Sequence, residues 1–404
     1  MNTFLGIYML CMGLTAVTQL IIVLRGLLYL RFTFPRKLRP NFQSIYKSFG
    51  APAPSVTVFI PCKGISADLQ NNIASMLCQD YTNYRLFYIT ESKDDPASAL
   101  LASTASQNHR LHHVIAGCAT RCCQKNHNLL TAIDYAKKKG IAGEIYVFAD
   151  MDVCPDKNWL NNITLPLADE TVFAVTGFGS LIPGGTFSEH FHAAFNALQE
   201  MAMTGRCYAA MWGGAMALTR QHFETYDVHR TWSTAVVDDM ALTAIIKKHR
   251  LKRVFSPDCR VMAEAPYPNL NRVLKWIIRQ TQYAAIYLPS YTLLGICLNT
   301  ALLLGIFMLP VTVLLALLGD ISWDLPLCHL IFYILTSLSI SLLSAFGEHK
   351  KLEWRWLVYA PLFLILGTYC TWIGFFSKRI VWANIVYNVG KNGEVFDIRR
   401  EKTA

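Results

Sequence analysis

Two carboxylates separated by a single residue, Asp150 and Asp152, follow the apolar run at residues 145–149 of this 404-residue chain. Mg²⁺ and Mn²⁺ prefer carboxylate oxygens, and Mg²⁺ in particular often takes only one or two of them from a protein while phosphate oxygens complete its shell. The pair therefore suits a divalent cation that is bound together with a diphosphate. Asp-x-Asp is also short and common in turns, so its position after a strand is stronger evidence for a metal site than the motif itself.

A second acidic pair, Asp238 and Asp239, opens a stretch of helical character. One interpretation is structural, because carboxylates at the start of a helix are favoured by the helix dipole. The other interpretation is chemical. A hydroxyl is a weak nucleophile, and a positioned carboxylate, by preference Asp239, would remove its proton. Taken alone, the pair favours the structural interpretation.

Two further groups are also ambiguous when taken alone. Asp94 and Asp95 precede a proline, and acidic residues at such a place are often only turn formers. The other group stands just before a long apolar segment, where basic and aromatic side chains usually anchor a protein at the membrane interface. The same side chains could hold a diphosphate leaving group; they are Arg272, Lys275 and Trp276.

The elements that would position these groups alternate between strand and helix from residue 55 onward. Apolar, β-rich runs predict strands at residues 56–60, 86–89, 112–115 and 145–149. The first is followed by an amphipathic pattern that predicts a helix, with its apolar residues at Ile65, Leu69, Ile73, Met76 and Leu77. Such alternation indicates a parallel or mixed α/β sheet, in which ligands bind beyond the carboxyl ends of the strands. The acidic groups after the second and fourth strands lie at that edge.

The composition excludes a wholly soluble protein, because 53% of the residues are hydrophobic and only 16% are charged. We expect an N-terminal transmembrane anchor over residues 1–30 and a basic linker over 31–54. The α/β domain should occupy 55–285, about three transmembrane helices 286–377, and a basic tail 378–404. The candidate C-terminal spans are 289–317, 327–346 and 357–376.

The net charge of +10 favours a membrane partner over nucleic acid, because many basic residues flank the apolar runs. This positive-inside pattern predicts a multi-pass membrane protein whose catalytic domain faces the cytoplasm. One anchor and three later spans would put the basic tail on the other side, against the same rule, so the side of the tail stays open. The flanking residues are Arg31, Arg36, Lys37 and Arg39, and later His349, Lys350, Lys351 and Arg355.

The order of the four groups resembles the signature of family 2-like, GT-A fold inverting glycosyltransferases. The resemblance is closest to the ceramide glucosyltransferase branch, family 21, with its bacterial relatives that act on hopanoid-type lipids, and it extends over most of the chain. Further stretches extend the match: Pro61-Cys62-Lys63-Gly64 with Asn71-Asn72, Lys93 to Ala97, Lys125-x-x-Asn128-Leu129, Gly213 to Leu218, and Trp382 with Tyr387.

The resemblance implies a Rossmann-like mixed sheet, a UDP-sugar donor, Mg²⁺ or Mn²⁺ and a membrane lipid as acceptor. It places Asp95, Asp94 and Lys125 in the donor-binding set, with Asp95 at the nucleoside. Asp150 would contact the metal and the diphosphate, and Asp152 would complete the metal site. Asp239 would be the general base with Asp238 beside it. The remaining implied donor-binding residues are those that close over the diphosphate and the acceptor: Arg272, Lys275 and Trp276.

The chain departs from the family pattern at one of these positions. The motif normally has Arg where Lys275 stands, and a lysine keeps the charge but cannot make the planar two-point contact with phosphate. Relatives in the ceramide branch also vary the second Asp of Asp-x-Asp, so Asp152 is the less secure ligand of the two.

The expected activity is inverting transfer of a hexose, glucose first, from a UDP-sugar to a lipid hydroxyl, ceramide first. A hopanoid, diacylglycerol or a polyprenyl phosphate is an alternative acceptor. A processive synthase is disfavoured, because three C-terminal spans are few for a translocation channel. The alternative from another class is a catalytically inactive membrane protein that binds lipid or sugar nucleotide.

Overall fold

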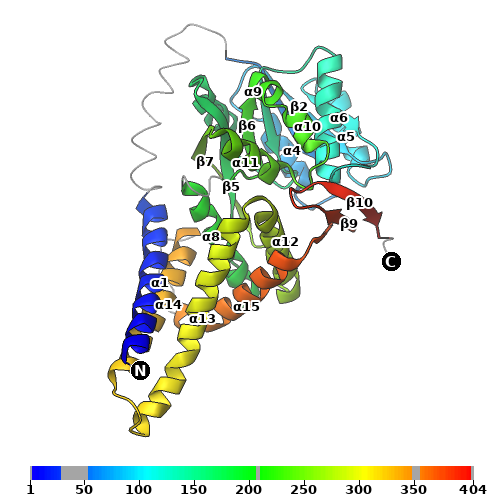
Figure 1. Cartoon of the computed structure of the whole chain (residues 1–404). Helices are drawn as coiled ribbons and strands as arrows, with labels where there is room; N and C mark the ends of the chain where they lie inside the picture. The colour runs from blue at the N-terminus through cyan, green and yellow to red at the C-terminus, as the bar shows by residue number, and fades with distance from the viewer. Residues whose placement is uncertain (1, 29–52, 206–209, 348–354, 402–404) are drawn as a thin grey trace. The chain divides into compact units, whose positions relative to one another are not determined.

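The computed structural model describes residues 2–28, 53–205, 210–347 and 355–401 (Figure 1). Most of the predicted basic linker, and the basic residues at 349–351, lie outside the described residues. The chain forms two compact units. The helical unit comprises residues 1–29, 180–205 and 262–377, and the α/β unit comprises 30–179, 206–261 and 378–404.

A seven-stranded mixed sheet forms the centre of the α/β unit, in the order β3-β2-β1-β4-β6-β5-β7. Neighbours β3, β2, β1 and β4 run parallel, whereas β6 is antiparallel to both β4 and β5. The four predicted strands are all present. The strands are β1 (Val56–Pro61), β2 (Tyr84–Thr90), β3 (Leu111–Ile115), β4 (Ile145–Ala149), β5 (Val172–Ile182), β6 (Ala215–Thr219) and β7 (Lys252–Glu264).

The central strands read as nearly continuous apolar runs, with Thr57 as a buried polar exception, because both of their faces are buried. On one face, Val58 and Val147 belong to the main apolar core. On the other face, Phe59 contacts the rings of Phe87 and Phe148, with centroids 5.6 and 5.7 Å apart. The alternation of side chains along each strand thus fills two layers of core, and the strand ends are held in a fixed register.

Helices of the α/β unit connect the strands (Figure 1). The predicted amphipathic helix is shorter than expected, and Ile65 is exposed outside it. Residues 65–68 belong to the loop after β1, in which Gly64 has a φ of +73°, and the helix begins only at Leu69. The helices are α4 (Leu69–Leu77), α5 (Ser98–Gln107), α6 (Gln124–Lys138), α7 (Trp159–Thr164) with a 3₁₀ turn (Leu165–Ala168), α9 (Arg220–Thr225), α10 (Val228–Trp232) and α11 (Asp238–His249).

The last described residues form a small antiparallel sheet that belongs to the α/β unit. Its strands are β8 (Arg379–Trp382), β9 (Ile385–Val389) and β10 (Val395–Arg400), in the order β10-β9-β8. Ala383 and Asn384 both have positive φ, as a two-residue hairpin turn requires. The sequence analysis described residues 378–404 only as a basic tail and did not predict these strands.

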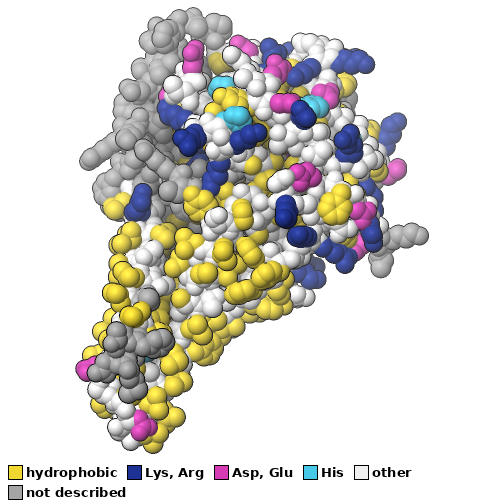
Figure 2. Space-filling view, viewed as in Figure 1, with side chains coloured by type: hydrophobic (Ala, Val, Ile, Leu, Met, Phe, Trp, Pro, Cys, Tyr) yellow, Lys and Arg dark blue, Asp and Glu magenta, His cyan; other side chains and the backbone are white. Residues whose placement is uncertain are grey.

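Among the described residues, the helical unit contains four helices that are long and apolar enough to cross a membrane. They coincide with the predicted spans and are consistent with a membrane protein. Large apolar side chains such as Leu14, Leu317 and Phe376 are exposed on them, and Figure 2 shows apolar side chains gathered over these helices. The helices of this unit are α1 (Asn2–Leu28), α8 (Phe187–Thr204), α12 (Leu270–Tyr287), α13 (Pro289–Leu317), α14 (Asp324–Gly347) and α15 (Trp356–Phe376).

Candidate active site

Lys125, in the first turn of α6, joins two of the predicted acidic groups. Its Nζ lies 2.8 Å from Oδ1 of Asp150, which follows β4, and 3.1 Å from Oδ2 of Asp238, at the start of α11. Burial by itself lowers the pKa of Lys125, but Asp150, Asp238 and Asp239 outweigh this effect and hold the pKa well above its usual range. The structure therefore places an ammonium that is charged at neutral pH between the two acidic groups.

The two carboxylates at the start of α11 differ in burial and in their partners. Asp238 is fully buried, and the ammonium of Lys125 faces it. Asp239 is partly buried and accepts hydrogen bonds from the backbone N–H groups of Gly213 (2.9 Å) and Met240 (2.6 Å). Burial and, second, the charge of Asp238 raise the pKa of Asp239 to about 7. A carboxyl group that titrates near neutral pH is well suited to accept and release a proton.

Neither residue of this pair is the N-cap of α11, which is Val237 and makes no side-chain capping bond. Asp239 does accept the N–H of Met240 within the first turn, so part of the structural role predicted for such carboxylates is present. The ion pair of Asp238 with Lys125 is a long-range contact that a helix cap does not require.

Gly213 brings the backbone into this cluster. Its carbonyl oxygen accepts from Lys125 Nζ at 3.2 Å while its N–H donates to Asp239. A Cβ at Gly213 would lie 2.7 Å from Lys125 Nζ, and one at Gly214 would lie 2.3 Å from the ring of Trp212. The segment before β6 can therefore approach the lysine and the carboxylates only because both positions are glycine.

Asp150 and Asp152 lie at the carboxyl end of β4, as predicted, and both are accessible to solvent. Within the described ranges, no three His, Cys, Asp or Glu side chains come together as a metal site. A cation here would have two protein carboxylates and would need further oxygens from a bound diphosphate. That donor set fits Mg²⁺ or Mn²⁺, which accept few protein ligands when phosphate is present.

Asp95 ties together the loops that follow β1 and β2. Both of its carboxylate oxygens lie 3.1 Å from the N–H of Gly64, and Oδ1 also accepts from the N–H of Ala97 at 2.9 Å. Its neighbour Asp94 is exposed. These bonds fix the position of Asp95 at the strand edge, where ligands of such sheets bind.

The predicted basic and aromatic group lies on α12 in the helical unit, whereas the carboxylates and Lys125 belong to the α/β unit. Arg272 and Lys275 are exposed, and Trp276 is partly buried. The ring of Trp276 packs edge-on against His192 of α8, with centroids 4.4 Å apart. Burial lowers the pKa of His192 to about 4, so this imidazole is neutral at pH 7. The sequence analysis did not single out His192.

A polar cluster at the ends of β1 and β2 was also missed. Arg400 of β10 donates from Nη2 to Glu91 at 2.7 Å and to Gln124 Oε1 at 2.7 Å. Lys63 donates to the carbonyl oxygen of Ala383 at 2.9 Å and lies 3.8 Å from Glu91. Burial raises the pKa of Glu91, but the hydrogen bonds from Arg400 and Cys118 and the nearby positive charges of Arg400 and Lys63 bring it below its usual value. Lys63 and Tyr387 lie in sequence stretches that resemble family 21, and that resemblance was the signal from which this cluster could have been found.

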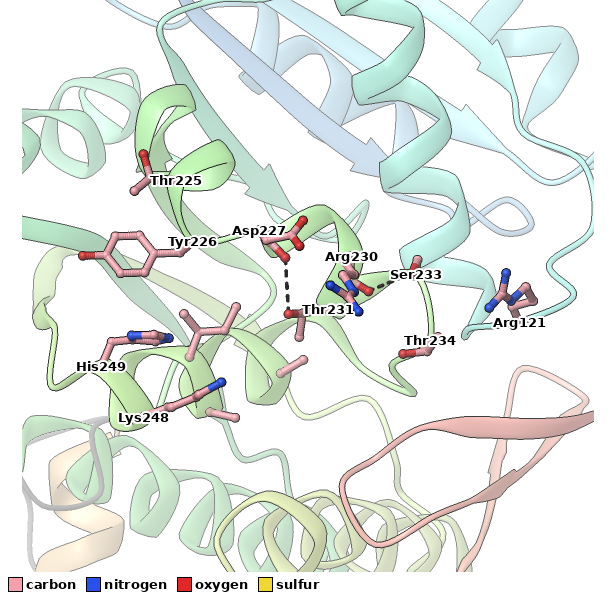
Figure 3. Close-up of a pocket in the computed structure, with 13 residues that line it drawn as sticks. Arg121, Thr225, Tyr226, Asp227, Arg230, Thr231, Ser233, Thr234, Lys248 and His249 are labelled. Carbon is pink, nitrogen blue, oxygen red and sulfur yellow. Dashed lines mark hydrogen bonds between the residues drawn. The ribbon is translucent and has the colours of Figure 1, made fainter.

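A separate cavity of about 880 Å³ opens beside α10 and α11 (Figure 3). Three cationic side chains, Arg121, Arg230 and Lys248, are among its lining residues, and none of the predicted site residues is. On α11 the lining residues Ala241, Ile245 and Lys248 lie on the opposite side of the helix from Asp239, at 100° per residue. This cavity is therefore distinct from the carboxylate site.

A mixed α/β sheet with acidic residues at the ends of its strands, joined to helices suited to a membrane, is the arrangement expected of a membrane-bound sugar-nucleotide glycosyltransferase of the GT-A type. The family model of glycosyl transferase family 21 matches residues 18–395. The chain therefore belongs to glycosyltransferase family 21, the ceramide glucosyltransferase family. The predicted family and fold class are confirmed.

Solved glycosyltransferase structures resemble the chain more loosely. One is the mannosyltransferase PcManGT from Pyrobaculum calidifontis in complex with GDP-Man and Mn²⁺, with 19% identity, 89% of this chain and 99% of that chain covered, and a TM-score of 0.46. Another is glucosyl-3-phosphoglycerate synthase from Mycobacterium tuberculosis in complex with Mn²⁺, UDP and glucosyl-3-phosphoglycerate. It shows 14% identity over 61% of this chain and 84% of that chain, with a TM-score of 0.39. No curated protein matches the chain.

Proposed function

We propose that this chain transfers a hexose, glucose first, from a UDP-sugar to the hydroxyl group of a membrane lipid, ceramide first, with inversion at the anomeric carbon. The observation that carries the proposal is the cluster in which Lys125 joins Asp150 to Asp238 while Asp239 stands next in the chain. In a chain of family 21, this arrangement supports a diphosphate site at Asp150 and a general base at Asp239.

The donor would lie along the strand ends, with Asp95 and Asp94 at the nucleoside and Asp150 near the diphosphate. Mg²⁺ or Mn²⁺ held by Asp150 and Asp152 would supply positive charge for the departing nucleoside diphosphate. Lys125 adds a cation to the same region. We assign Arg272, Lys275 and Trp276 to the donor-binding set, in which they would close over the diphosphate and the acceptor.

Asp239 would take the proton from the acceptor hydroxyl. The hydroxyl oxygen attacks the anomeric carbon as the bond from that carbon to the diphosphate oxygen breaks, and this single displacement inverts the configuration. The N–H groups of Gly213 and Met240 hold the carboxyl group in place. Burial and, second, the charge of Asp238 raise the pKa of Asp239 to about 7, and the charge of Lys125 limits the rise.

We further propose that residues 55–285 form the catalytic domain and that this domain faces the cytoplasm. The basic residues that flank the apolar segments support this orientation. The lipid acceptor would then reach the site from the membrane, to which the four long helices belong under this proposal.

The test is a transfer assay with detergent-purified protein. UDP-glucose, UDP-N-acetylglucosamine and UDP-galactose are offered against ceramide, diacylglycerol, a hopanoid and a polyprenyl phosphate, with and without Mn²⁺ or Mg²⁺. Metal-dependent formation of glucosylceramide is the expected result. A product on another lipid would keep the enzyme class and change the acceptor. Absence of product with every pair, while UDP-sugar still binds, would favour the inactive binding protein.

A further inference from the structure

The C-terminal sheet contacts the chain at the start of α6, directly beside Lys125. The hydroxyl oxygen of Tyr387, a buried residue of β9, accepts a hydrogen bond from the backbone N–H of Gln124 at 3.2 Å. Arg400 of β10 donates to Oε1 of the same glutamine at 2.7 Å. Gln124 is the first residue of α6, so both contacts fix the end of the helix that carries Lys125.

The same sheet also contacts the segment that leads into α11. The N–H of Val395 donates to the carbonyl oxygen of Thr234 at 2.8 Å. The N–H of Val236 donates to the carbonyl oxygen of Gly393 at 3.0 Å. Ala235 and Glu394 form an isolated antiparallel bridge between these bonds. Val236 stands two residues before Asp238, so these contacts fix the chain close to the acidic pair.

The two contacted segments are also bonded to each other. The N–H of Cys123 donates to the carbonyl oxygen of Ala235 at 3.0 Å, and the side-chain amide of Asn126 donates to that of Trp232 at 3.2 Å. The start of α6, the segment before α11 and the C-terminal sheet thus form one hydrogen-bonded assembly. The ion pair between Lys125 and Asp238 joins the two elements that this assembly aligns.

We propose that Tyr387 and Arg400 are positioning residues of the transfer reaction, which hold Lys125 and the Asp238–Asp239 pair in register through α6 and the segment before α11. The proposal rests on the function proposed above and deepens it. A catalytic pair must be held within a fraction of an ångström of its working geometry, and supporting residues that touch no substrate provide this precision. Glu91 in turn holds the guanidinium of Arg400, with its Oε1 2.7 Å from Nη2 and 3.1 Å from Nε.

Three substitutions test the proposal against a matched control. Tyr387→Phe removes the oxygen that accepts from Gln124, and Arg400→Gln removes the charged contact. Arg400→Lys keeps the charge but cannot reach Glu91 and Gln124 with one planar group. The control is Arg399→Gln. It removes the same charge from the adjacent, exposed residue, whose ion pair is with Asp397 of its own strand.

We expect Tyr387→Phe and Arg400→Gln each to lower kcat about tenfold. A misplacement of catalytic groups by about 1 Å costs about a hundredfold in rate, and these substitutions should displace Lys125 and the acidic pair by less than that. The KM for the UDP-sugar should stay within about twofold of the wild-type value, and Arg400→Lys should lose less activity than Arg400→Gln. Arg399→Gln should leave both constants unchanged. A rise in donor KM with unchanged kcat would overturn the proposal, since Arg400 would then belong to the groups that touch the donor.

Amide hydrogen exchange measured by mass spectrometry provides a second readout that needs no substrate. Peptides that contain residues 234–236 and the start of α6 should exchange faster in Tyr387→Phe and in both Arg400 variants than in Arg399→Gln, while β4 stays protected. Equal protection in all proteins would overturn the proposal. If the wild-type protein transfers no sugar, the proposed function fails and exchange alone decides whether the sheet positions these segments. If one variant does not fold, the remaining variants and the control still give the comparison.

Discussion

At the scale of single residues, the site depends on one buried cation. Lys125 exposes only 13% of its side chain and is within 3.1 Å of two carboxylates on different elements. Removing the charge leaves Asp238 buried without its cation, and an uncompensated buried charge is costly. Lys125 should therefore matter for stability as well as for activity.

We predict that Lys125→Met lowers the free energy of unfolding by about 3–5 kcal/mol and abolishes transfer. Lys137→Met is the matched control in the same helix, because Lys137 pairs with Glu224 at 2.9 Å on the exposed surface. Exposed pairs contribute about 0–1 kcal/mol. Denaturant unfolding of the detergent-solubilised variants measures the loss of unfolding free energy in Lys125→Met and in Lys137→Met. Equal losses in the two variants would contradict a special role for Lys125.

The raised pKa of Asp239 predicts opposite effects of pH on activity and on stability. The general base must be ionised, so kcat should rise with pH up to about 7 and then level off. Because the pKa is higher in the folded than in the unfolded protein, this group's contribution to stability is fully present below about pH 4 and is lost as pH rises through about 7. The pH dependence of kcat measures the effect on activity, and unfolding curves measure the effect on stability, both between about pH 5 and about pH 9.

Asp239→Asn tests the role of this carboxylate as the general base. It should lower kcat at least about a hundredfold while UDP-sugar binding stays close to that of the wild type. Asp134→Asn, on the exposed side of α6, is the control and should keep the full rate and the pH profile. An Asp239→Asn protein that turned over normally would rule out the assigned base.

The chemistry-bearing residues could be named from sequence because carboxylates after strands and before a helix form a recognisable order. The contacts among them could not. Arg400 and Glu91 are 309 positions apart, and their pairing depends on how the C-terminal sheet folds back onto the α/β unit. Gly213 reads as an ordinary loop glycine until three separate segments meet at its backbone.

At the scale of elements, the predictable parts were those whose burial leaves a strong pattern. The central strands are buried on both faces and read as apolar runs, and the long helices read as apolar segments. The predicted helix extended back to Ile65, whereas α4 begins at Leu69 and Ile65 is exposed, because apolar periodicity marks the buried face of a helix better than its first residue. The strands of the tail are short, and β10 has a register shift between Val395 and Asp397, which breaks the alternation that would have marked it.

The segment before β6 is the element that should tolerate change least. We predict that Gly214→Ala lowers the free energy of unfolding by about 1–3 kcal/mol and reduces transfer, since its Cβ would meet the Trp212 ring at 2.3 Å and shift the backbone that bonds Asp239. Gly185→Ala is the control, because nothing lies within 4 Å of its Cβ position. Thermal unfolding and kcat are measured for both. A harmless Gly214→Ala would show that this loop has room to adapt.

At the scale of the whole molecule, the proposed function requires a particular side of the membrane. The exposed apolar helices need lipid or detergent around them, and a UDP-sugar must reach the α/β unit from the aqueous phase that holds it. The basic residues beside the apolar segments argue that this phase is the cytoplasm. The described cysteines are free thiols, and two of the three exposed ones in the α/β unit, Cys78 and Cys154, offer a direct test.

We predict that a membrane-impermeant maleimide labels Cys78 and Cys154 in inside-out vesicles and leaves them unlabelled in intact cells. Mass spectrometry of the digested protein identifies which thiol reacted. Cys259 is the internal control: it is fully buried, burial raises the pKa of its thiol, and it should stay unlabelled in both preparations. Labelling of Cys154 in intact cells would place the α/β unit outside. The donor would then have to be supplied on that side, and the orientation argued from charge would be wrong while the chemistry of the carboxylate site would stand.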